Sequence, residues 1–329
     1  MTYILIGGPI MNELFERIIF NALQANATDI HLQSKNKGTI KLRINGKLKF
    51  FDEINIQEMK KLINYIRFIS KIDLNYHLKP QTGHIKYHYQ NKNYNLRISN
   101  LVGKDNETLV IRVLNNHEYI SLNNISKIDE VTHFLHQIVT KENGLFIISG
   151  ATGSGKSTTL YALMDEIYKT YHRNIITIED PIEIDKDYCL QIELNEKQGI
   201  TYEESLKQIL RHDPDIIMIG EIRDQKTASL ALTCSLTGHL VLTTIHASNC
   251  INTMKRLENL GLSQLDLNDI LIGVMTQKIK YGKDDHLVVV SEFMNQNDIY
   301  HYLNNNDIAY FDFNKSKSAL NSKGIYYEE

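Results

Sequence analysis

The segment GATGSGKS, residues 150–157, is the feature that most constrains this chain, because it fits the pattern GxxxxGK[ST]. It follows the apolar run LFIIS, and apolar residues at helical spacing follow it over residues 160–167. A strand, a glycine-rich loop and a helix in this order form a P-loop, whose backbone N–H groups cradle phosphate oxygens. The alternative is a glycine-rich turn with a chance lysine, which would not require a strand before it and a helix after it. The sequence therefore predicts a nucleotide phosphate site at the start of the helix.

The residues of this loop have separate expected tasks. Gly153 and Gly155 let the backbone approach the phosphates because they carry no Cβ. Lys156 is expected to reach the β- and γ-phosphates, and the Ser157 hydroxyl is expected to bind Mg²⁺. We therefore expect ATP and Mg²⁺ as ligands. The predicted nucleotide-binding residues are Gly150, Ala151, Thr152, Gly153, Ser154, Gly155, Lys156, Ser157 and Thr158.

Two further segments supply carboxylates, which a P-loop enzyme needs near its metal and its attacking water. The apolar run DIIMIGE ends at Glu221, where a strand would open into the ligand-binding crevice of an α/β sheet. The run TIEDPIE places Glu179, Asp180 and Glu183 just past another strand. Glu221 is the predicted metal ligand beside Ser157. The acid that activates water stays open among Glu179, Glu183 and Glu221.

His239 and His246 bracket the apolar strand LVLTTI. Residues seven apart point to opposite faces of a pleated strand, so the two histidines are not expected to bind one metal ion. Each has two interpretations, namely a hydrogen-bonded structural residue near a strand end and a sensor of the γ-phosphate.

The chain from residue 131 onward alternates between short apolar strands and helical segments. This rhythm predicts a largely parallel sheet with helices on both faces. After residue 294 the sequence becomes polar, which predicts a weakly packed tail with one helix or strand. The expected strands are 145–149, 175–178, 216–219, 240–245 and 287–290.

The first 114 residues have a different texture. Apolar residues at helical spacing over 15–23 and 59–66 predict two amphipathic helices. Alternating segments joined at Asn45-Gly46 and at Asn91-Lys92 predict two hairpins, and 109–114 predicts one more strand. We therefore expect an α+β domain over 1–114, an Asn-rich linker over 115–130, and a second domain over 131–329 with a polar C-terminal tail.

Composition excludes several function classes. The 36 Lys and Arg residues against 39 Asp and Glu residues give a net charge of −3, so no global positive field favours nucleic acid. There is also no basic run with interleaved aromatic residues, and direct nucleic-acid binding is not expected. Cys189, Cys234 and Cys250 form no CxxC pair, so neither zinc nor a disulfide framework is expected. No stretch approaches the roughly 20 apolar residues of a membrane span, and we expect a cytoplasmic protein.

Four segments together resemble a known family. GATGSGKSTT, ITIEDPIE, LRHDPDIIMIGEIRD and TGHLVLTTIHASN, in this order and at these intervals, resemble the nucleotide-site boxes of the secretion and type IV pilus motor ATPases. The segment TDIHL at 28–32 resembles the start of that family's N-terminal domain. The resemblance implies a RecA-like P-loop ATPase core, a smaller PAS-like α+β domain before it, and a homo-hexameric ring.

The resemblance also implies roles for individual residues. Glu183 corresponds to the glutamate that activates water, and Glu221 corresponds to the Walker B acid. His239 and His246 correspond to the histidine box, which in the family couples the γ-phosphate to domain movement.

Arg97 and Arg112 lie fifteen residues apart, which is the interval of two charge-neutralising arginine fingers in the small domain of the family. From the residues alone, each is a cation on an alternating strand, and the simpler interpretation is a solvated charge.

Departures from the family pattern narrow its subclass. The three cysteines do not form the four-cysteine zinc module of type II secretion members, and we expect none of their leading domains. FMNQNDIYHYLNNN after Glu292 does not resemble the AIRNLIRE segment of retraction motors. Lys226 stands where the family commonly has Glu, which puts local salt-bridging in doubt. By elimination the chain resembles the short assembly motors of Gram-positive competence pili.

This subclass implies partners and a location. We expect direct contact with a polytopic membrane platform protein, indirect action on pilin-like subunits, and a peripheral position at the inner face of the cell membrane. The alternatives are a pilus retraction, DNA-conjugation or other secretion motor on the same fold, and a scaffold that binds nucleotide without hydrolysing it.

Overall fold

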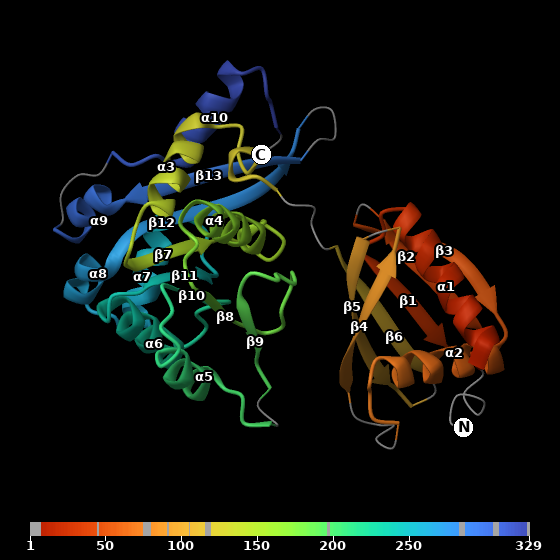
Figure 1. The fold of residues 1–329 in the computed structure, drawn as a ribbon. Coiled ribbons are helices and arrows are strands. Elements are labelled where there is room, and N and C mark those ends of the chain that lie inside the picture. The colour runs from red at the N-terminus through yellow and green to blue at the C-terminus, as the bar shows by residue number, and fades with distance from the viewer. Residues whose placement is uncertain are drawn as a thin grey trace. The chain divides into compact units, whose positions relative to one another are not determined.

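The computed structural model describes residues 8–44, 46–74, 80–90, 92–104, 106–115, 120–195, 198–282, 287–304 and 309–327. The chain divides into two compact units, Met1–Asn116 and His117–Glu329 (Figure 1). Within the described ranges, no helix combines the length and the apolar composition of a bilayer-spanning segment.

The first unit is an antiparallel sheet with helices on one face. Its strand order is β3-β2-β1-β6-β5-β4, and every neighbouring pair is antiparallel. Its elements are α1 (Gly8–Gln24), β1 (Asp29–Ser34), β2 (Gly38–Ile44), β3 (Lys47–Ile54), α2 (Ile56–Ile69), β4 (Gln81–Tyr89), β5 (Lys92–Val102) and β6 (Glu107–Asn115).

Alternation along the strands separates the two faces of this sheet. Ile30 and Leu32 of β1 and Ile98 of β5 are buried against α1 and α2, while Arg97 and Arg112 are exposed on the strands between such residues. The predicted α+β architecture is confirmed. The central strand β1 was not predicted as a strand. The turn residues Asn45 and Asn91 lie outside the described residues.

The second unit contains a seven-stranded sheet in the order β13-β12-β7-β11-β10-β8-β9. All neighbouring pairs are parallel except β12 and β13, which are antiparallel. The predicted α/β class and its largely parallel sheet are confirmed. The strands are β7 (Gly144–Ser149), β8 (Ile175–Glu179), β9 (Leu190–Glu193), β10 (Ile216–Ile219), β11 (Leu240–Ile245), β12 (Leu271–Tyr281) and β13 (Leu287–Asn295).

Helices cover both faces of this sheet, which explains why its central strands are continuously apolar. Residues of α3, α4 and α10 form one core with the sheet, and residues of α5 to α9 form the other (Figure 1). The helices are η2 (Leu122–Asn124), α3 (Asp129–Val139), α4 (Lys156–Tyr171), α5 (Tyr202–Ile209), α6 (Gln225–Leu236), α7 (Cys250–Asn259), α8 (Gln264–Ile270), α9 (Gln296–Leu303) and α10 (Phe313–Ser322).

The predicted linker over 115–130 is too long. Residues 116–119 lie outside the described residues, but Leu122, Ile125 and Ile128 are buried in the core of the second unit. These three apolar residues recur at intervals of three within an otherwise polar segment. Burial of these three side chains fixes the segment to the second unit, which the polar composition of the segment does not reveal.

The expectation of a weakly packed C-terminal tail is wrong. Ile299 of α9 and Leu320 of α10 are almost fully buried, and α10 packs against β13. Asn295 and Asp298 form a capping box at the start of α9, and Asp312 caps α10. A few apolar residues at helical spacing and good caps are sufficient here because the rest of each helix faces solvent.

We expect all three cysteines to resist modification in the folded protein. Burial raises the pKa of Cys234 to about 11 and that of Cys189 to about 12, and raises the pKa of Cys250 well above its usual value. Since the thiolate is the reactive form, DTNB at pH 8 should label the native protein about a hundredfold more slowly than free cysteine. The same reagent should titrate three thiols in guanidinium. Rapid labelling of native protein would contradict the burial.

Candidate functional site

The phosphate loop connects Ser149, the last residue of β7, to Lys156, the first residue of α4. Gly153 and Gly155 have φ of 78° and 84°, a left-handed conformation in which residues with a Cβ are strained. Gly155 directly precedes the helix, so the free N–H groups of its first turn lie at this end of the sheet. The geometry is that of an anion-binding loop at a helix N-terminus.

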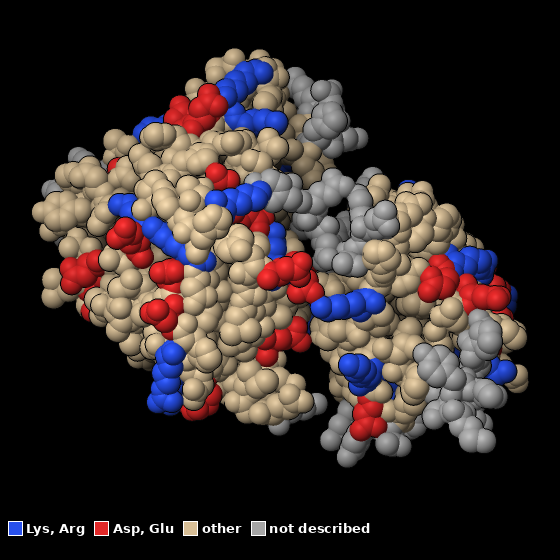
Figure 2. All heavy atoms as spheres, viewed as in Figure 1, with Lys and Arg blue, Asp and Glu red and all other residues tan. Residues whose placement is uncertain are grey.

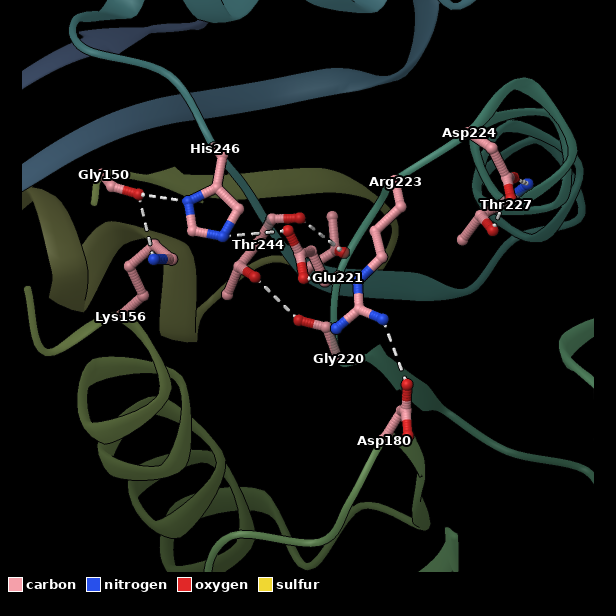
Figure 3. Close-up of polar contacts among 11 residues, drawn as sticks. Gly150, Lys156, Asp180, Gly220, Glu221, Arg223, Asp224, Thr227, Thr244 and His246 are labelled. Carbon is pink, nitrogen blue, oxygen red and sulfur yellow. Dashed lines mark hydrogen bonds and ion pairs between the residues drawn. The ribbon is translucent and has the colours of Figure 1, made fainter. Parts of the chain in front are cut away.

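Lys156 is held within the loop that it follows (Figure 3). Its Nζ donates to the carbonyl oxygens of Gly150 at 3.0 Å and Ala151 at 2.9 Å. Burial lowers the pKa of Lys156, and the carboxylates of Glu221 and Glu183 oppose that shift. Both predicted acids therefore favour the charged form of the predicted phosphate-binding cation.

Glu221 follows β10 and Gly220, whose carbonyl accepts a hydrogen bond from the Thr244 hydroxyl at 2.7 Å. Its carboxylate lies 2.7 Å from Nε of Arg223 and 3.2 Å from Nε2 of His246. Arg223 also contacts Asp180, with 3.0 Å between its guanidinium and the carboxylate (Figure 3). Arg223 thus joins the acid after β10 to the acid after β8.

His246 lies at the C-terminal end of β11 and connects the loop to the acid. Its Nδ1 is 3.1 Å from the Gly150 carbonyl oxygen, which can only accept, so Nδ1 is the donor. Its Nε2 faces Glu221 (Figure 3). One imidazole ring therefore contacts both the phosphate loop and Glu221.

His239 does not reach this site, and its assignment to the site is corrected. It precedes β11, and its carbonyl accepts from the N–H of Gly144 at the start of β7. Seven residues of strand, roughly 23 Å, separate it from His246. Its Nδ1 lies 3.0 Å from the Cys234 carbonyl at the end of α6 and 3.0 Å from the Thr237 hydroxyl. These contacts are those of a structural residue.

The acids after β8 have different surroundings. Glu179 is buried, and it accepts hydrogen bonds from the hydroxyls of Tyr161 and Thr177 and from the Gln191 amide. Burial raises the pKa of Glu179 although these hydrogen bonds oppose the shift. Glu183 is exposed, and among the described residues its side chain has no hydrogen-bond or ion-pair partner. Only Glu183 of these two is free to meet a ligand.

Arg97 and Arg112 belong to the first unit, whereas the loop belongs to the second. They are directly opposite one another on β5 and β6, and both are exposed. Arg112 forms an ion pair with Asp29 at 2.8 Å. Burial alone would raise the pKa of Asp29, but hydrogen bonds from Arg112 and Thr28 lower it below its usual value. The register therefore places both arginines on one face of the sheet, and Asp29 pairs with one of them.

Position 226 does not decide the local salt bridges. Lys226 is exposed on α6, while Asp224 caps that helix by accepting from the backbone and hydroxyl of Thr227. The ion pairs of this segment come from Arg223, which sequence analysis did not include in the site. Its position two residues after Glu221 was the sequence signal by which it could have been included.

The donors expected for Mg²⁺ fit that ion. Among the described residues, no group of three or more His, Cys, Asp and Glu side chains is arranged to hold a metal ion. Mg²⁺ does not require such a cage, because it is commonly held by one or two protein oxygens, phosphate oxygens and water. The Ser157 hydroxyl and the Glu221 carboxylate are oxygen donors of this kind.

The fold and the loop define the class of this protein as RecA-like with a P-loop. The chain belongs to the family of type II/IV secretion system proteins, whose family model matches residues 7–305. It is similar to competence protein ComGA of Halalkalibacterium halodurans, with 39% identity over 265 residues that cover 80% of this chain and 76% of that protein. The family resemblance is confirmed.

Two solved structures share the fold. The ATPase DotB of Legionella pneumophila has a TM-score of 0.78 at 23% identity and covers 96% of this chain and 93% of its own. The pilus retraction motor PilT with bound ADP has a TM-score of 0.74 at 25% identity and covers 94% of this chain and 93% of its own. These similarities confirm the predicted RecA-like core.

Proposed function

We propose that this protein is a motor ATPase that hydrolyses MgATP to drive assembly of a competence or type IV pilus-like structure. The observation that carries the proposal is the chain of contacts at the phosphate loop, in which Lys156 and His246 both bond the Gly150 carbonyl and His246 faces Glu221. Similarity to ComGA supports the competence role, and similarity to the ADP-bound PilT motor supports the nucleotide.

Each residue of the loop region has a task in this proposal. Lys156 exchanges the two loop carbonyls that it contacts for phosphate oxygens, and the N–H groups at the start of α4 bind further oxygens. Mg²⁺, when bound with the nucleotide, would neutralise developing charge on the phosphates. Ser157 and Glu221 are the residues that would hold it. Glu183 orients the attacking water and accepts its proton, because its carboxylate is exposed and has no partner among the described residues.

The arginines of the first unit would couple hydrolysis to movement. A cation of one unit that contacts phosphates bound by the other makes the favoured arrangement of the two units depend on the nucleotide. Arg97 suits this role because, among the described residues, its side chain has no hydrogen-bond or ion-pair partner. Arg112 is held by Asp29 beside it.

Arg97→Ala should lower kcat about 10- to 100-fold and change the Kd for MgADP little, because a finger acts on charge that develops in the transition state. Hydrolysis and binding are measured separately, by phosphate release and by calorimetry. Arg17→Ala is the matched control, since Arg17 forms an exposed ion pair with Asp52 on another part of the same unit. Equal loss of binding and hydrolysis would indicate a folding role for Arg97.

The proposal includes partners and a location. We infer a homo-hexamer that contacts a polytopic membrane platform protein at the inner face of the cell membrane and acts on pilin-like subunits through it. Figure 2 shows Lys and Arg interspersed with Asp and Glu over the viewed face, with no continuous basic surface there. This supports action through protein contacts without direct nucleic-acid binding.

A pilus retraction motor is the second candidate, because the PilT motor shares the fold at 25% identity. Deletion of the gene distinguishes the two. Loss of surface pili supports assembly, and accumulation of pili supports retraction.

ATPase activity of the purified chain with and without the co-expressed platform protein tests the motor itself, and we expect the platform protein to stimulate the activity. An ATPase rate that the platform protein does not change would contradict the proposed partnership.

A further inference from the structure

Strand β12 continues past the end of β7 and brings a glutamine beneath the phosphate loop. The two strands are neighbours and run parallel, with Thr276 opposite Ser149, the last residue of β7 (Figure 1). Their hydroxyls are 2.7 Å apart. Gln277 is the next residue of β12, at the level where the chain after Ser149 leaves the sheet to form the loop.

The Gln277 carboxamide is oriented by two hydrogen bonds of opposite polarity. Its side chain is almost fully buried, and Nε2 donates to the carbonyl oxygen of Ser154 at 2.8 Å. Its Oε1 accepts from the Thr159 hydroxyl at 2.8 Å, and that hydroxyl also lies 3.2 Å from the Gly155 carbonyl. A carboxylate at this position lacks the donor, and an apolar side chain lacks both functions.

Two loop glycines are required by the same strand. A Cβ added at Gly155 would lie 2.7 Å from Nε2 of Gln277, and one added at Gly150 would lie 2.4 Å from the Gln277 carbonyl oxygen. Real side chains do not approach so closely. Gln277 therefore contacts the loop near both of its ends, and the glycines accommodate β12 below the loop as well as phosphate above it.

We propose that Gln277 is a positioning residue that sets the shape of the phosphate loop. The Ser154 carbonyl and the Gly155 N–H belong to one trans peptide, so they point in opposite directions. Because Gln277 fixes the carbonyl on the sheet side, the Gly155 N–H is aimed away from the sheet, toward the phosphates. The adjacent Lys156 backbone is fixed with it. This inference rests on the proposed nucleotide site and adds the residue that preorganises it.

The test compares nucleotide binding by the full chain with Gln277→Glu, Gln277→Met and Thr159→Val. We expect the Kd for MgADP to rise about 10- to 100-fold in both Gln277 variants, because a buried carbonyl loses its donor. Selectivity for ADP over AMP should fall as well, since the loop recognises the β-phosphate. Calorimetry measures both nucleotides without hydrolysis. In the Gln277→Met background, Thr159→Val should raise the Kd for MgADP little further, because the two side chains form one shared hydrogen bond.

A general folding defect has a different signature. It would weaken ADP and AMP equally, whereas a loop defect weakens ADP more than AMP, even where the lost hydrogen bond also lowers the Tm. Gln208→Glu, at an exposed position of α5, is the matched control. An ADP affinity within twofold of wild type in folded Gln277→Met, or equal weakening of ADP and AMP, would overturn this inference alone. A wild-type chain that does not bind MgADP would overturn the proposed function with it.

Discussion

Lys156→Ala should lower kcat/KM for MgATP by about 10²- to 10⁴-fold while the protein stays folded. A charge-assisted hydrogen bond contributes about 1.5–3 kcal/mol, and Lys156 is placed to make two of them to phosphate oxygens. Truncation of Lys156 removes two hydrogen bonds to loop carbonyls, and the buried one, that of Gly150, keeps the His246 ring as a partner, so the fold should tolerate the change. Steady-state phosphate release over a range of MgATP concentrations measures the effect.

Lys169→Ala is the matched control for this variant. Lys169 lies in the last turn of the same helix and is exposed, so the control removes an equal charge away from the loop. We expect the control to retain wild-type kcat/KM. Near wild-type turnover in purified Lys156→Ala would show that the loop is not the phosphate site.

Glu183→Gln should bind MgATP and hydrolyse it about 10²- to 10⁴-fold more slowly, because a group that orients water and takes its proton commonly contributes that factor. The change keeps the shape of the side chain and removes only its charge and basicity. Since Glu183 is exposed and has no described side-chain partner, the fold should be unaffected. Single-turnover hydrolysis and nucleotide binding are the two measurements.

The expected signature is a low kcat with an ATP affinity equal to or higher than that of wild type. Asp187→Asn, an exposed acid of the same loop, is the control and should hydrolyse ATP normally. Normal turnover in Glu183→Gln would transfer the water-activating role to Glu221, because Glu179 is buried and already accepts three hydrogen bonds.

Periodicity predicted most of the fold, and it failed where a strand is not patterned by hydrophobicity alone. The five apolar runs of the second unit all became strands because helices bury both of their faces. Strand β12 was not predicted, since it contains Gly273, Thr276 and Gln277 among its apolar residues. Each of these residues has a local contact that explains it. Gly273 admits the Phe134 ring, Thr276 bonds the Ser149 hydroxyl at the end of β7, and Gln277 bonds the phosphate loop at Ser154.

Sequence motifs predicted most residues of the candidate site but not the contacts between them. Lys156, Glu221 and His246 come together because parallel strands end at one edge of the sheet. Motif spacing could not show that Arg223 joins Glu221 to Asp180, since that contact depends on how the loops after two different strands fold. The motifs also placed His239 at the site. However, His239 and His246 lie at opposite ends of strand β11, so His239 is at the opposite edge of the sheet.

Phosphate release from MgATP by the purified protein tests the central claim most directly. We expect turnover that requires Mg²⁺, disappears on chelation with EDTA, is lost in Lys156→Ala and increases with the platform protein. A wild-type chain that binds MgATP but releases no phosphate above the Lys156→Ala level, even with the platform protein present, would contradict the account. That result would leave a nucleotide-gated scaffold in place of a motor.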